Sequence, residues 1–138
     1  MKLKTIITIA FAIICFATFG QTTKGKLYKT DHWADIKRKG GWVNAMDNPT
    51  YEKVEILKTS KQIKVTFGTK VYNYTIVSEK IFSEVMMNYT VTLNGKNYTL
   101  RIADMENGTH AVTLDDGITK DGVWMVSDIK DISTIDVK

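Results

Sequence analysis

From Tyr51 onward, apolar and polar residues alternate, which is typical of strands with one buried face. The clearest hairpin surrounds Asn94-Gly95, because both central residues of a type I′ turn need a positive φ and this pair tolerates it well. A two-residue turn there pairs Leu93 with Lys96 and then aligns three apolar pairs on one face: Val91/Tyr98, Tyr89/Leu100 and Met87/Ile102. A slip of the pairing by one residue would bury the polar residues that alternate with these apolar ones, so the register is well specified.

The same reasoning extends to the preceding strands. A turn at Ser60-Lys61 places apolar residues opposite each other as the pairs Ile56/Val65 and Val54/Phe67. A turn at Thr69-Lys70 does the same for the pairs Phe67/Tyr72, Val65/Tyr74 and Ile63/Ile76. One apolar face is then continuous across three strands, and this agreement between independently chosen turns supports the fold.

The alternation predicts strands at 41–46, 51–59, 62–68, 70–77, 85–93, 96–103, 109–114 and 122–128. The rhythm breaks between Ser78 and Glu84, which indicates a longer connection with room for a helical turn, and the tail from Ile129 shows no strong pattern. Eight sequential antiparallel strands remove their exposed edges most simply by closing. We therefore expect an all-β fold, an antiparallel up-and-down meander of about eight strands that forms a small barrel. A two-sheet sandwich and an open sheet are the alternatives.

A short N-terminal helix is expected ahead of the meander. Thr30 or Asp31 would cap it, Trp33 and Ile36 would share a face, and Gly40 would end it. The basic run 37–39 would then lie at its carboxyl end, where positive charge suits the helix dipole.

The first twenty residues have the order of a secretory signal peptide. Lys2 and Lys4 form a basic start, an apolar run extends from Ile6 to Phe19, and Gly20 offers a small residue for cleavage before Gln21. The run is shorter than the roughly 18 residues of a membrane span. We expect a cleaved signal at 1–20, an N-terminal segment with the helix at 21–40 and a single β domain at 41–138. The product would be periplasmic or secreted, with no stable membrane span after cleavage; a buried first helix or a membrane anchor is the alternative.

Cleavage would change the charge and the cysteine content. The 19 basic residues become 17 against 15 acidic ones, so the net charge falls from +4 to +2. Because no concentrated basic stripe remains beyond residues 37–39, no nucleic-acid partner is expected. The only cysteine, Cys15, lies in the apolar run, and an exported domain without thiols suits a bacterial envelope. The ending Phe19-Gly20-Gln21 resembles that of exported Bacteroidota proteins of unknown function.

A second resemblance rests on the start of the meander. A short helix followed by Gly40-Gly41-Trp42 at the opening of eight strands resembles the lipocalin and calycin pattern. That resemblance implies a barrel whose closed end is plugged by Trp42, with Lys130 as the candidate for the basic residue stacked over it.

The usual catalytic constellations are not found in the sequence. No serine lies in a Gly-x-Ser-x-Gly elbow, and Asp115-Asp116 followed by Gly117 is typical of a turn. His32 and His110 are the only imidazoles, and neither has an obvious set of companion ligands for a metal. We therefore expect no enzyme activity, no metal site and no cofactor.

The candidate site is the inward-facing side of the meander. It combines aromatic rings that carry polar groups with one imidazole of the same parity, namely Tyr72, Tyr74, Tyr89, Tyr98, Trp124 and His110. The tyrosines would either line a ligand cavity or belong to a filled core with hydroxyls at its rim. His110 would either face the interior and bond a ligand or lie at the rim of the barrel.

Two functions of different classes fit these patterns, and the sequence carries no signal that identifies a ligand, a partner or an oligomeric state. The favoured hypothesis is a small exported β-barrel binding module for an apolar or amphipathic small ligand. The alternative is a protein-interaction module of the cell envelope, an inhibitor or assembly factor. It would use the outward apolar residues Leu57, Val71, Val77 and Met86.

Overall fold

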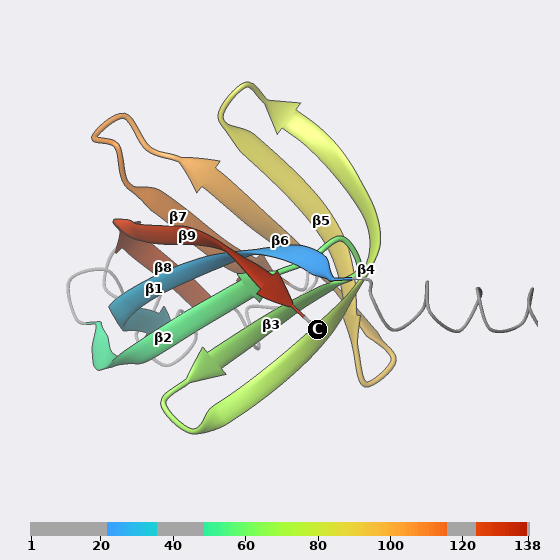
Figure 1. Cartoon of the computed structure of the whole chain (residues 1–138), viewed down its shortest axis with the longest axis horizontal. Helices are drawn as coiled ribbons and strands as arrows, with labels where there is room; N and C mark the ends of the chain where they lie inside the picture. The colour runs from blue at the N-terminus through green and yellow to red at the C-terminus, as the bar shows by residue number, and fades with distance from the viewer. Residues whose placement is uncertain (1–21, 36–48, 116–123, 138) are drawn as a thin grey trace, which may run out of the picture.

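The computed structural model describes residues 22–35, 49–115 and 124–137, and these residues form antiparallel strands (Figure 1). In chain order the strands are β1 (Thr23–Asp35), β2 (Thr50–Lys58), β3 (Gln62–Phe67), β4 (Lys70–Ser83), β5 (Met86–Leu93), β6 (Lys96–Asp104), β7 (His110–Asp115), β8 (Trp124–Ile129) and β9 (Asp131–Val137). Within these ranges no helix is long and apolar enough to cross a membrane.

Strand β1 closes the sheet into a barrel. Strands β2 to β8 pair in chain order, and β1 then pairs with β2 on one edge and with β8 on the other, at Ala34 and Asp35. Strand β9 is an additional strand that follows β8 almost directly and pairs with β1 over Thr23–Lys29. The fold is therefore an all-β, antiparallel, eight-stranded closed barrel with one extra strand, which confirms the predicted meander and its closure.

The predicted registers are confirmed for two hairpins and wrong by two residues for a third. Every pair expected around Asn94-Gly95 is present, and both residues have a positive φ, 52° and 78°. The pairs across Ser60-Lys61 are also present. Between β3 and β4, Val65 lies opposite Tyr72 because the turn is Gly68-Thr69 and not Thr69-Lys70. Moving a two-residue turn by one position moves each pairing by two, so the buried face is preserved while the partners change.

The segment expected to begin a helix is a strand instead. Residues 30–35 belong to β1, and a bulge at Asp31 separates the pair Thr30/Val54 from the pair His32/Tyr51. The extra residue lies on β2, where Glu52 and Lys53 together face Asp31. Beyond this shift Trp33 packs against the core, five positions after the buried Tyr28, so the two-residue period of the strand is interrupted. Pairing with β2 and β8 supplies stabilisation that local helix signals do not outweigh. The remainder of the expected helix, the strand at 41–46 and Trp42 lie outside the described residues.

Two other expectations about the later chain are corrected. The connection expected between Ser78 and Glu84 is mostly strand, since β4 continues to Ser83 after a bulge at Val77. The bulge explains why the alternation of apolar and polar residues is interrupted in this segment. The tail beyond Ile129 is the strand β9, whose residues are exposed or half-buried because β9 pairs with β1 alone among the described strands. Lys130 is exposed between β8 and β9.

The inward residues form one apolar core along the barrel. Its centre is fully buried and consists of aliphatic residues from β2 to β8, among them Ile56, Ile63, Val65, Val91, Leu100, Val112, Val126 and Ile129. Strand directions define the two barrel ends. One end carries the β3–β4 and β5–β6 turns, and the other carries the β2–β3, β4–β5 and β6–β7 connections.

Candidate functional site

Strand β4 and its partner β5 project beyond the neighbouring β2–β3 hairpin. The last backbone hydrogen bond from β4 toward β3 joins the Ile76 amide to the Lys61 carbonyl at 2.9 Å. From Val77 to Ser83, β4 pairs only with β5 within the described chain. We call residues 77–86 the hairpin tip; Figure 1 shows it at the upper right. Its large apolar side chains are exposed and comprise Val77, Ile81, Phe82 and Val85.

A cavity of about 460 Å³ lies between the hairpin tip and the β1–β2 side of the barrel. This volume is within the range of about 300–1,000 Å³ that is typical of small-molecule sites. We call it the mouth cavity; its lining combines apolar, phenolic and charged side chains from β1, β2, β4, β5 and β6. They are Lys26, Tyr28, Lys58, Ile81, Ser83, Glu84, Val85, Met86, Met87, Tyr89, Ile102 and Asp104.

Two buried tyrosines form the inner surface of the mouth cavity. Tyr28 is 3% exposed and Tyr89 is 5% exposed. Burial, followed by the proximity of Tyr89 and Asp104, raises the pKa of Tyr28 to about 12. Burial also raises the pKa of Tyr89, with a smaller contribution from Glu79. Both phenols are therefore neutral at physiological pH and offer hydroxyl groups to a ligand.

Two lysines lie on the β1–β2 wall of the mouth cavity. Lys26 and Lys58 are direct cross-strand partners. The Lys26 ammonium lies over the Tyr28 ring, 5.5 Å from its centroid, and the Lys58 ammonium lies over the Tyr89 ring at 5.1 Å. Neither lysine forms an ion pair with any residue that the structure describes.

His110 lies next to this cavity and faces the interior. Its ring contacts Tyr28, with 6.1 Å between centroids, and its Nε2 lies 2.7 Å from the Asp104 carboxylate. Its Nδ1 atom is buried and has no hydrogen-bond partner among the described residues. His110 is not part of the cavity lining, so its contact with the cavity runs through Tyr28 and Asp104.

The opposite end of the barrel is filled by an aromatic plug, which we define as Trp33, Phe67, Tyr72, Tyr74, Tyr98 and Trp124. Ring centroids lie 4.6 Å apart for Trp33 and Phe67 and 5.3 Å apart for Phe67 and Trp124. The Trp33 indole donates a hydrogen bond to Glu52 at 3.0 Å. Burial raises the pKa of Tyr74 to about 12 despite a hydrogen bond with Trp124. These contacts describe a packed core.

The six residues expected to form one site therefore lie at two different ends of the barrel. Tyr89 lines the mouth cavity and His110 lies beside it. Tyr72, Tyr74, Tyr98 and Trp124 belong to the aromatic plug at the other end. The sequence reasoning missed Tyr28 and Lys26, because their strand was not predicted, and it missed Lys58, whose two-residue spacing from Ile56 was a usable signal.

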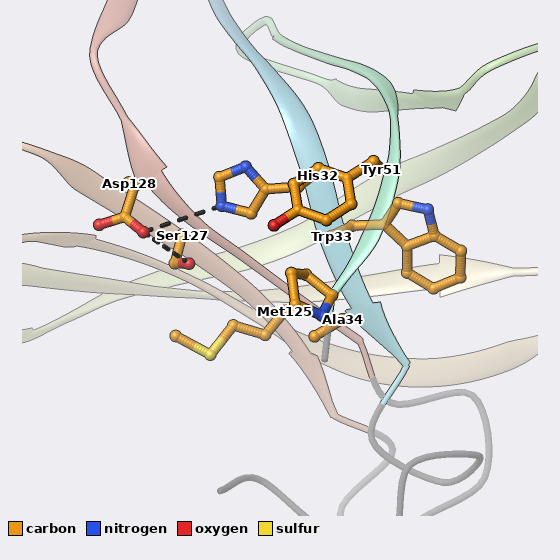
Figure 2. Close-up of a pocket in the computed structure, with 8 residues that line it drawn as sticks. His32, Trp33, Ala34, Tyr51, Met125, Ser127 and Asp128 are labelled. Atoms are coloured by element: carbon orange, nitrogen blue, oxygen red, sulfur yellow. Dashed lines mark hydrogen bonds and ion pairs between the residues drawn. The ribbon is translucent and has the colours of Figure 1, made fainter. Parts of the chain in front are cut away.

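A second hollow, of about 340 Å³, lies on the outer face where β1 meets β8 (Figure 2). Its lining consists of His32, Trp33, Ala34, Pro49, Tyr51, Met125, Ser127 and Asp128. Ala34 and Pro49 border segments that the structure does not describe. No residue that lines the mouth cavity adjoins such a segment, and we therefore take this cavity as the candidate site.

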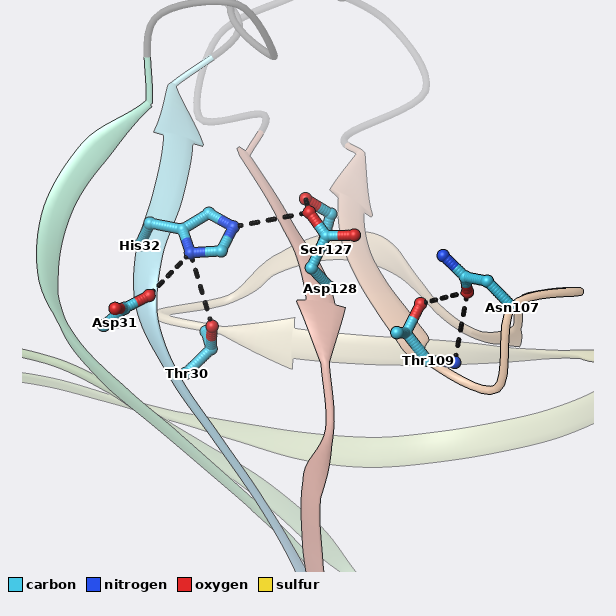
Figure 3. Close-up of polar contacts among 7 residues, drawn as sticks. All are labelled: Thr30, Asp31, His32, Asn107, Thr109, Ser127 and Asp128. Carbon is cyan, nitrogen blue, oxygen red and sulfur yellow. Dashed lines mark hydrogen bonds and ion pairs between the residues drawn. The ribbon is translucent and has the colours of Figure 1, made fainter.

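His32 lies between two carboxylates in this outer hollow (Figure 3). Its Nδ1 is 2.8 Å from Asp31, and its Nε2 is 3.8 Å from Asp128. The hydrogen bond from His32 lowers the pKa of the Asp31 carboxyl. The Ser127 hydroxyl donates to Asp128 at 3.4 Å and not to His32, so no serine–histidine pair forms here. No group of three or more metal-ligating side chains gathers in the described segments.

Figure 3 also shows the β6–β7 connection. The Asn107 side-chain oxygen accepts hydrogen bonds from the Thr109 amide at 3.2 Å and from the Thr109 hydroxyl at 2.6 Å. This is an Asx-type turn, completed by Gly108 with a φ of 79°. It holds Asp104 and His110 at the two ends of the connection, opposite each other across β6 and β7.

Comparison of the chain with protein-family models, with curated proteins and with solved structures gave no match. The class of protein is thus defined by its architecture alone, a small antiparallel closed β-barrel with one filled end and one hollow end.

Proposed function

We propose that this protein is a binding module that takes an apolar or amphipathic small molecule into the mouth cavity. The observation that carries the proposal is the lining, in which aliphatic and thioether side chains and two buried tyrosines surround a space of about 460 Å³. The exposed apolar residues of the hairpin tip support it, because a bound apolar molecule would remove part of their surface from water.

The proposal includes export to the periplasm or the medium. It is supported by the basic start, the apolar run and the small residue before Gln21, although these residues lie outside the described part. The eight-stranded closed barrel is compatible with the lipocalin resemblance at the level of architecture. Since one fold serves many functions, the proposed activity rests on the cavity and not on that resemblance.

An uncharged fluorescent probe, N-phenyl-1-naphthylamine, tests the proposal. Titration of the wild-type protein should give a saturable increase in fluorescence. Ile81→Asp places a charge in the cavity lining at a residue that is 70% exposed, so it should weaken binding severalfold without unfolding the protein. Val71→Asp is the matched control, because Val71 is 49% exposed on the same strand and lies outside the lining.

Equal binding by both variants would place the probe elsewhere, and no binding by the wild type would remove the proposal. A protein-interaction module would then take its place, favoured by the edge of β4 over residues 77–83, which no described strand other than β5 pairs with. The outward residues first considered for that role do not form one patch. Val71 and Val77 lie about 20 Å apart along β4, and Met86 lines the cavity.

A further inference from the structure

We infer that the mouth cavity selects an anionic amphiphile, a molecule with one carboxylate head and one apolar tail, and that Lys26 and Lys58 bind the head. The inference rests on the proposed function and adds the charge of the ligand. It starts from the position of the two lysines in the barrel wall.

Lys26 and Lys58 occupy inward positions of the sheet. Tyr28 and Ile56 are buried cross-strand partners, and the register runs without a bulge from this pair to the pair formed by the two lysines. Residues two positions apart on a strand share a face, so both lysine side chains start on the interior face at the mouth. Like charges placed directly opposite on adjacent strands repel each other and are unfavourable.

Among the described residues, no carboxylate forms an ion pair with either lysine. The Asp104 carboxylate, which also lines the cavity, is engaged by His110 at 2.7 Å. Glu84 and Glu79 belong to the exposed hairpin tip on the opposite wall, and neither forms an ion pair with Lys26 or Lys58 in the described structure. Within the described structure the Lys26 ammonium lies over the face of Tyr28 and the Lys58 ammonium over the face of Tyr89.

A carboxylate placed between the two ammonium groups would relieve their repulsion and receive charge-assisted hydrogen bonds. The tail would then extend along the apolar part of the lining, which includes Met87, Ile102 and Val85. A volume of about 460 Å³ corresponds to ~15 water-sized groups at ~30 Å³ each, enough for a medium-length chain and its head.

The test compares four probes by isothermal titration calorimetry below their micellar concentrations. Decanoate carries both head and tail, decanol has the tail without charge, decylammonium reverses the charge, and acetate is the head alone. We expect decanoate to bind about tenfold more tightly than decanol, and acetate and decylammonium to bind more weakly than either. Binding of acetate as strong as that of decanoate would reduce the site to one for small anions and overturn the inference.

The double variant Lys26→Met/Lys58→Met keeps the apolar stems and removes both charges. It should lose the preference for the charged head, so that decanoate and decanol bind to it with equal affinity. The matched control is Lys29→Met/Lys64→Met, which removes two charges from the outer face of β1 and β3, the two strands that flank β2. It should leave the preference for decanoate unchanged. Lys58→Glu provides an independent test, because it should shift the preference toward decylammonium.

The outcomes separate the two proposals. If the wild type binds decanol and decanoate equally, the inferred head site is wrong and the proposed binding function stands. If it binds neither, the proposed function itself fails. If the outer-face control loses the preference for decanoate as fully as the double variant, the effect is one of overall charge and the assignment of Lys26 and Lys58 is overturned.

Discussion

The substitutions Ile56→Ala and Ile81→Ala make the same chemical change, one at a fully buried position of this barrel and the other at an exposed position. Ile56 lies on β2, opposite Tyr28 on the closing strand β1 and opposite Val65 on β3, and its side chain is fully buried. Ile81 lies on the hairpin tip and is 70% exposed. If β1 closes the barrel over a packed interior, only the first substitution should destabilise the protein.

The expected magnitude follows from the burial of Ile56. The change removes three carbon atoms, each of which contributes about 0.8 kcal/mol when fully buried, which gives roughly 2.4 kcal/mol. Packed neighbours collapse only partly around the vacated space, so the total loss should reach about 3–4 kcal/mol, within the ~2–5 kcal/mol observed for such changes in cores. For a domain of this size the Tm should fall by about 12–16 °C. Ile81→Ala should change the free energy of unfolding by no more than about 0.5 kcal/mol.

Urea unfolding followed by tryptophan fluorescence measures both values, since Trp33 and Trp124 lie in the aromatic plug. Probe binding supplies the converse readout, because Ile81 lines the mouth cavity and its truncation should weaken binding without loss of stability. A cost below about 1 kcal/mol for Ile56→Ala, or equal costs for the two variants, would refute a closed and packed barrel.

Two further predictions concern protonation and backbone conformation. The pKa values of Tyr28 and Tyr74 are raised to about 12 in the folded state, so the stability they contribute is complete below pH ~10 and is lost as the pH rises through about 12. The loss should be on the order of 2–3 kcal/mol per tyrosine, measured by urea unfolding across this interval, and it should disappear in Tyr28→Phe/Tyr74→Phe; an unchanged loss in that variant would exclude tyrosine burial as the cause. Gly68→Ala should destabilise the protein more than Gly95→Ala, as measured by Tm, although both glycines have a positive φ. A Cβ at Gly68 would clash with the Glu52 carboxylate, which accepts a hydrogen bond from the Trp33 indole, whereas a Cβ at Gly95 meets nothing within 4 Å. Equal effects would show that Glu52 moves freely.

The sequence predicted those parts of the fold that depend on local turns and parity. Asn94-Gly95 specified a hairpin that the structure reproduces pair by pair. The β3–β4 turn was predicted one residue too late, because apolar residues still face apolar residues after the strand pairing shifts by two residues. Gly68, with a φ of 59°, was the available signal, since a type II′ turn favours glycine at its first central position.

The elements that were missed depend on distant contacts or on bulges. β1 is a strand because β2 and β8, which follow later in the chain, both pair with it. The register shifts at Asp31 and Val77 come from one additional residue each, on β2 in the first case and on β4 in the second. Beyond such a shift the two-residue period points to the wrong face. The hairpin tip was consequently expected to be a loop, and the mouth cavity that it covers could not be anticipated.

The composition of the inward positions accounts for the difference between the two barrel ends. At the filled end the inward positions carry large rings, and Trp33, Phe67 and Trp124 pack against one another. At the hollow end, the inward-facing positions of β1 and β2 end with Lys26 and Lys58. A lysine cannot enter a packed apolar core without a partner, so an inward lysine is tolerated only where the interior opens to water or to a bound anion. Two such lysines side by side therefore locate the mouth of the barrel, and substitution of this pair is the most direct way to separate the binding function from the stability of the fold.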